Sequence, residues 1–233
     1  ARDQVAVGVE VHLDELGRKD ILNGRILVDW TPTESLKLSF NANGYSDESD
    51  VQAMRYEGFQ PLSPASVGRI AEPYRSLLQN YPRPSSDPRA ADWGPRKPKQ
   101  DNLKTQYSMR ADYTLTDDTQ LTYIISRSDF EYDRFPDPDG MSFNNFEFRI
   151  DGDIESTFHE LRLSGKLFDE RATWLTGLNY EDSTVEELDE RRIDYSSSSF
   201  ALGTPFSRND TLVAQDFTSK AIFAAFDYAL TDQ

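Results

Sequence analysis

The chain of 233 residues has a formal net charge of -16 and no cysteine, which excludes disulfides and thiolate chemistry. The acidic balance also excludes nucleic-acid binding, because that function needs a basic surface to neutralise phosphates. The mean hydropathy is low, at -0.68, and no apolar run approaches the ~18 residues of a membrane helix.

Strict alternation of apolar and polar residues is the main pattern along the chain. In one segment, for example, Met109, Ala111 and Tyr113 alternate with Arg110 and Asp112. Successive side chains of a β-strand point to opposite faces, so such a segment has one apolar and one polar side. Segments of ~9–11 alternating residues are typical of transmembrane β-barrel strands. We predict eight strands, at 5–13, 22–30, 36–45, 106–115, 120–130, 157–167, 172–180 and 218–230, with all twelve prolines outside them.

The connections between these strands alternate between two classes. Short turns are predicted at 31–35, 116–119 and 168–171, and long loops at 46–105, 131–156 and 181–217. An antiparallel meander places alternate connections at opposite ends of the sheet, so one end is short and the other elaborate. The sequence therefore predicts an all-β, antiparallel up-and-down sheet of the kind found in outer-membrane barrels, with long extracellular loops. We expect any helix to lie within 46–105.

Aromatic residues mark the short-turn end of the predicted sheet. Trp30, Tyr113 and Tyr228 lie on apolar faces there, where an interfacial girdle of a membrane barrel is expected.

Three stretches of the chain resemble the barrel of TonB-dependent outer-membrane receptors. They are residues 23–38, with the turn Trp30-Thr31-Pro32-Thr33 between two strands; residues 159–164, containing Glu160-Leu161-Arg162-Leu163; and residues 219–232, ending in Tyr228-Ala229-Leu230-Thr231-Asp232. The last ending repeats the pattern of residues 112–117, which enter a turn. By analogy we expect more barrel to follow, so that residues 1–233 are a segment of the barrel domain.

The resemblance implies a function as well as a fold. Receptors of this family have a 22-stranded barrel with an N-terminal plug, and a TonB complex drives their import of a scarce nutrient. For this chain the resemblance implies location in the cell outer membrane, contact with outer-membrane lipid and a small-molecule ligand. We expect the plug, the TonB box and the remaining strands to lie outside this chain.

No catalytic, cofactor or metal site is predicted, and the chain is not expected to be an enzyme. The two histidines, His12 and His159, lie within predicted strands and on opposite kinds of face. Asp137-Pro138-Asp139-Gly140 could offer oxygens to Ca²⁺, but it lacks the twelve-residue loop pattern and is ordinary turn chemistry.

Two groups of residues are candidates for contacts within a barrel. Charged side chains on the polar faces are predicted to face the lumen and to hold a plug: Arg110, Asp112, Glu160, Arg162 and Lys166. In the long loop 46–105, Tyr81 and Trp93 are the candidate ligand contacts, because aromatic faces suit sugars and aromatic compounds.

Charge in the loops suggests a class of ligand. Residues 131–156 hold eight acids and two bases, and residues 181–217 hold nine acids and three bases. If both lie at the mouth of a barrel, they disfavour anions and favour a neutral or weakly cationic ligand, such as a saccharide or an aromatic compound. Uptake of a neutral solute should then be nearly independent of Glu186, Glu187, Asp189 and Glu190.

Two alternatives remain compatible with alternation alone. One is a small closed eight-stranded outer-membrane barrel, because an even strand count returns the chain to its starting side. The other is a soluble β-sandwich or calyx that binds carbohydrate or lipid, with its apolar face turned toward a core.

Overall fold

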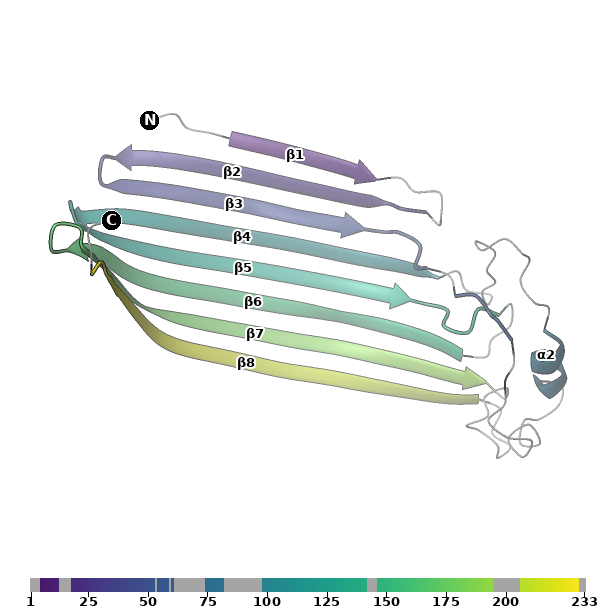
Figure 1. The fold of residues 1–233 in the computed structure, drawn as a ribbon. Helices are drawn as coiled ribbons and strands as arrows, with labels where there is room; N and C mark the ends of the chain where they lie inside the picture. The colour runs from purple at the N-terminus through teal and green to yellow at the C-terminus, as the bar shows by residue number, and fades with distance from the viewer. Residues whose placement is uncertain are drawn as a thin grey trace.

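The computed structural model of the chain describes residues 5–12, 18–52, 54–58, 60, 74–81, 98–141, 146–194 and 206–230. These residues form one antiparallel sheet of eight strands (Figure 1). The strands are β1 (Val5–His12), β2 (Ile21–Thr33), β3 (Leu36–Asp47), β4 (Lys99–Thr116), β5 (Thr119–Phe135), β6 (Phe146–Leu167), β7 (Ala172–Asp194) and β8 (Phe206–Tyr228). A short helix, α2 (Tyr74–Asn80), lies between β3 and β4 in the chain, inside the expected range. No helix in the described ranges is long and apolar enough to cross a lipid bilayer.

The strands follow one another across the sheet in chain order, which confirms the predicted meander. Each pairs in antiparallel register with its sequence neighbours. Within the described residues β1 pairs with β2 alone and β8 with β7 alone. The described sheet is therefore open at both edges, which contradicts the small closed barrel.

Every strand except β1 is longer than predicted. β4 begins at Lys99 instead of residue 106, so the end of the predicted loop 46–105 is strand. β5 continues to Phe135 and β6 already begins at Phe146, so most of the predicted loop 131–156 is strand. β7 and β8 likewise take up much of 181–217. The acidic residues of these stretches favoured loops because carboxylates have low β propensity. In the sheet, arginines on the same and on neighbouring strands form ion pairs with some of them. Arg149, for example, forms ion pairs with Asp133 at 2.9 Å and Asp151 at 2.7 Å.

Pro32 is an exception to the prediction that proline lies outside the strands. It falls within β2, at the point where the register with β3 shifts between Trp30 and Thr33. A proline cannot donate the ladder hydrogen bond, so a bulge next to a turn is where a strand tolerates it.

The register confirms the predicted division of side chains between the two faces. One face, called the leucine face, carries Leu36, Leu38, Phe40, Met109, Ala111, Leu161, Leu163, Ile222 and Phe226. The other, called the arginine face, carries Lys37, Asn41, Arg110, Asp112, Glu160 and Arg162. Trp30, Tyr113 and Tyr228 lie on the leucine face near the short turns, as expected.

Both faces change character toward the long-loop ends of β5 to β8. There the leucine face becomes acidic and carries Asp129, Glu131, Asp133, Asp151, Asp153, Glu155, Asp182, Glu186, Glu190, Asp210 and Asp216. The arginine face becomes aromatic and aliphatic and carries Phe130, Tyr132, Phe148, Ile150, Ile154, Val185, Val213 and Phe217. Each face is therefore divided into two zones: a basal zone next to the short turns and a distal zone next to the long connections.

Candidate functional site

The predicted charged residues of the arginine face form ion pairs along their own strands. Arg110 donates two hydrogen bonds to the carboxylate of Asp112, at 2.8 and 3.0 Å. The hydroxyl of buried Thr122 on β5 donates to the same carboxylate at 2.7 Å. On β6, Arg162 forms an ion pair with Glu160. The basal zone of this face is therefore a polar surface whose charges are balanced in pairs.

A glycine allows an aromatic ring to join this surface. The Phe223 ring on β8 lies over Gly177 on β7, where a Cβ atom would come within 2.5 Å of the Phe223 Cζ atom. The Arg162 guanidinium lies 6.0 Å from the centre of the same ring. A ring packed over a strand glycine replaces the side chain that glycine lacks.

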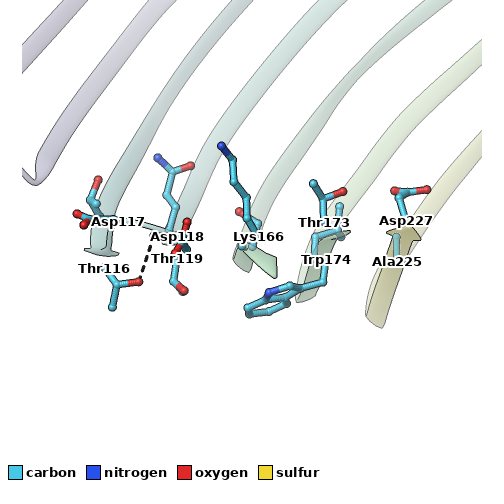
Figure 2. A pocket seen from close by; sticks show the side chains of 14 residues that line it. Thr116, Asp117, Asp118, Thr119, Lys166, Thr173, Trp174, Ala225 and Asp227 are labelled. Atoms are coloured by element: carbon cyan, nitrogen blue, oxygen red, sulfur yellow. Dashed lines mark hydrogen bonds between the residues drawn. The ribbon is translucent and has the colours of Figure 1, made fainter. Parts of the chain in front are cut away.

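Lys166, the fifth predicted residue, lies apart at the short-turn end and pairs with Glu170 at 2.6 Å. It borders a hollow between the β4–β5 turn and Trp174 (Figure 2). Figure 2 shows Lys166, Thr173 and Asp227 pointing to one side of the sheet and Trp174 to the other. The lining thus comes from both faces, so this hollow is not a single cavity for a ligand.

A cluster of aromatic rings lies on the arginine face in the distal zone. Phe130 and Tyr132 are two residues apart on β5, and their rings stack with centres 5.3 Å apart. The Tyr45 ring of β3 is tilted by 47° to the Phe130 ring, and the ring centres are 6.2 Å apart. The Arg134 guanidinium is 5.9 Å from the centre of the Tyr132 ring. We call Tyr45, Phe130 and Tyr132 the aromatic shelf.

Tyr132 is held in place from two strands away. Its hydroxyl donates a hydrogen bond of 2.6 Å to the Glu187 carboxylate on β7. Gly152 of β6 lies between them in the register, and a Cβ atom there would be 2.9 Å from the tyrosine hydroxyl. Because Gly152 has no side chain, the ring can cross β6. Burial, followed by the bond to Glu187, raises the pKa of Tyr132 to about 12.

This shift predicts a pH dependence for the aromatic shelf. The folded pKa lies above the ordinary value of 10, so the stabilisation is present below pH 10 and is lost as the pH rises from 10 to about 12. In a pH titration followed by tyrosinate absorbance, Tyr132→Phe should remove a tyrosine that ionises well above pH 10. Loss of a tyrosine that ionises near pH 10 would contradict this assignment.

The connection after β5 contains two neighbouring carboxyl groups, of which Asp137 is buried and Asp139 half-buried. Asp139 accepts hydrogen bonds from the backbone N–H of Phe146 at 2.7 Å and of Met141 at 2.9 Å. Burial and the neighbouring Asp137 raise the pKa of Asp139 to about 7. In the described residues no group of three or more His, Cys, Asp or Glu side chains is arranged to hold a metal ion. The hydrogen bonds of Asp137 and Asp139 order the turn.

The predicted loop contacts are only partly within the described residues. Trp93 lies outside them. Tyr81 packs edge-on against Tyr56, with ring centres 5.2 Å apart. A contact of Tyr81 or Trp93 with a ligand remains a prediction.

The acidic residues expected at the mouth divide between the two faces. Glu186 and Glu190 lie on the leucine face, whereas Glu187 and Asp189 lie on the arginine face with the aromatic shelf. The assumption that all of them face one opening is therefore wrong, because side chains alternate along an extended strand.

Sequence reasoning missed the aromatic shelf. The signal was present, because alternation continues past residue 130 with its polarity inverted: Phe130, Tyr132 and Arg134 alternate with Glu131 and Asp133. Period two alone would have kept this stretch in the strand.

Comparison of the structure with known proteins identifies the fold. Nearly the whole chain matches BauA, the ferric preacinetobactin receptor from Acinetobacter baumannii, with 10% sequence identity over 97% of this chain and a TM-score of 0.55. It also matches PiuA, a siderophore receptor from the same species, with 12% identity over 95% of this chain and a TM-score of 0.59. A third match is the ferric citrate transporter FecA, with 12% identity over 96% of this chain and a TM-score of 0.54. The chain spans 34%, 34% and 30% of their lengths.

No protein-family model and no curated protein matches the sequence. Identities of 10–12% show the fold alone. The chain has the fold of part of a TonB-dependent receptor barrel.

Proposed function

We propose that residues 1–233 are a segment of the barrel wall of an outer-membrane receptor that imports a scarce nutrient. The observation that carries this proposal is the basal zone of the leucine face. It exposes large apolar side chains, with Leu178 52% exposed and Ile222 87% exposed. In water this apolar surface is costly, whereas lipid removes the cost.

The dimensions of the apolar zone fit a bilayer. Along β4 it runs over residues 107–115, about the ~9–11 residues with which a tilted strand crosses a membrane. Aromatic rings bound it at both ends. Trp30 and Tyr113 lie near the short turns, and His159 and Tyr180 are opposite each other in the register at the distal border, with ring centres 6.2 Å apart. The leucine face then meets lipid, and the arginine face lines the lumen.

A soluble sandwich fits these observations less well. Such a fold needs a second sheet packed on the apolar face, and within the described ranges one sheet contains every strand. Energy for import would come from a TonB complex acting through a plug and a TonB box outside residues 1–233. The paired charges of Arg110, Asp112, Glu160 and Arg162 would contact that plug.

The experiment is an uptake assay on the full-length receptor in its native cells. A deletion strain is grown on a panel of oligosaccharides, aromatic acids and ferric chelates, each as the sole source of carbon or iron. Deleting the receptor should abolish use of one class, and deleting TonB should have the same effect. Use of every class without the receptor would contradict the proposed function.

The charged side chains near the aromatic shelf predict the charge of the ligand. The arginine face of the distal zone is nearly balanced, with Lys104, Arg134 and Arg191 against Asp47, Glu181, Glu187 and Asp189. This balance supports a neutral or weakly cationic ligand.

The association rate of a neutral or weakly cationic ligand with the full-length receptor should change less than about twofold between 0.01 and 0.15 M salt, although the screening length falls from ~30 to ~8 Å. A steep change would show that the native ligand is strongly charged.

A further inference from the structure

The geometry points to the aromatic shelf as a stacking surface for the ring of an uncharged saccharide. This inference rests on the proposed function and names the class of ligand that the receptor would take. The shelf lies on the arginine face in the distal zone, beyond the apolar zone that is assigned to lipid. A solute entering a barrel from outside would therefore meet it before the part of the lumen that crosses the membrane.

Contacts within the sheet position the rings of the shelf. Tyr132 stacks on Phe130 and is bonded to Glu187 across Gly152, and the Tyr45 ring is tilted by 47° to the Phe130 ring, with centres 6.2 Å apart. A surface that is already ordered loses little conformational entropy on binding, which favours affinity. The C–H groups of a sugar ring pack well on aromatic faces and edges, which are apolar and large.

Amide groups surround the shelf and suit hydroxyl groups. Asn43 donates to Gln106 at 3.5 Å, a long bond that a better partner can replace. Asn102 is directly opposite Tyr132 in the register and is only 3% exposed. Its side-chain oxygen accepts no hydrogen bond from the described residues.

These amides favour a sugar over an aromatic compound. A buried acceptor without a partner is costly, and a ligand hydroxyl that reached it, directly or through water, would remove that cost. Amides offer both donors and acceptors, which matches the hydroxyls of a sugar.

Charge also favours a saccharide over an anionic chelate. The carboxylate of Glu187 already accepts from Tyr132, and Asp189 is paired with Arg191 at 2.7 Å. Arg134 lies over the Tyr132 ring. Lys104 lies between Tyr45 and Phe130 in the register, so two cations, Lys104 and Arg134, border the shelf, against Asp47 and Glu187 on the same face. The shelf therefore presents aromatic surface and amides with balanced charge, which does not select an anion.

The test uses the purified full-length receptor on an oligosaccharide array, followed by calorimetric titration with the tightest-binding oligosaccharide. Tyr132→Ala should weaken binding by about tenfold or more. Phe130→Leu keeps apolar volume, removes the ring and should also weaken binding. Tyr180→Ala is the matched control, because Tyr180 lies on the leucine face, and it should leave the affinity unchanged.

The outcomes separate this inference from the proposed function. If no oligosaccharide binds, or if Phe130→Leu and Tyr132→Ala both bind normally, the saccharide assignment is overturned. TonB-dependent uptake of a ferric chelate or an aromatic acid would then still support a transport receptor. The opposite result is also possible. If the purified receptor binds a saccharide through the shelf, but cells take up that saccharide without the receptor and without TonB, only the transport function is overturned.

Discussion

Replacing Leu178 with arginine should destabilise the full-length receptor by ~2–4 kcal/mol in a lipid bilayer. Leu178 lies on the leucine face of β7 and is flanked in the register by Leu161 and Ile222. An arginine there places a guanidinium in hydrocarbon. The measurement is the urea midpoint of the receptor folded in phospholipid vesicles.

Leu188 provides a closely matched control for this substitution. It is the same residue type on the same face of the same strand, but its register neighbours are Asp151 and Leu212. Leu188→Arg should change stability little, because the new cation would lie beside a carboxylate in water. An equal loss of stability in Leu178→Arg and Leu188→Arg would show that the basal and distal zones of this face do not differ in their contact with lipid.

The second large effect is expected at Gly177. A Cβ atom there would lie 2.5 Å from the Phe223 Cζ atom and 2.7 Å from the Leu161 backbone oxygen. The ring can rotate away, but the backbone oxygen is fixed by the sheet. Gly177→Val should therefore cost ~1–3 kcal/mol or more, as overpacked sites do.

Gly24 is the control for the glycine substitution. It lies within β2, and nothing is within 4 Å of a Cβ atom built there. Gly24→Val should be neutral or slightly stabilising, since valine favours strands. The same urea titration measures both variants. A Gly177→Val midpoint equal to that of Gly24→Val would refute the close packing of Phe223.

Alternation in the sequence was sufficient to predict the strands, their order and the sorting of side chains in the basal zone. Met109 and Arg110 fall on opposite faces because period two fixes the facing once a segment is extended. The pattern is strong there because one side is consistently apolar.

The extent of the strands could not be predicted in the same way. In the distal zone the register places acids opposite acids, as with Glu131 and Asp153, an arrangement that disfavours pairing when it is considered alone. Arg127 offsets part of this repulsion, because it pairs with Asp129 on its own strand at 2.7 Å and with Glu155 on the neighbouring strand at 2.6 Å. Such cross-strand pairs depend on the register, which the sequence does not specify before the turns are known.

The candidate site was predicted in part for a related reason. Arg110 and Asp112 are two residues apart on one strand, so their pairing follows from the local pattern. The bond from Tyr132 to Glu187 joins residues 55 positions apart and needs Gly152 between them. A contact of this kind appears only once three strands are placed side by side.

The proposed function requires that the basal leucine face meets lipid and that the arginine face does not. Because the chain has no cysteine, single cysteines carrying an environment-sensitive fluorophore can be placed along β7 from residue 174 to residue 190. In vesicles containing brominated lipid, positions 174, 176, 178 and 180 should be quenched. Positions 175 and 179, and every position from 184 to 190, should not be. Equal quenching of neighbouring positions, or quenching that extends through residue 188, would contradict the claim.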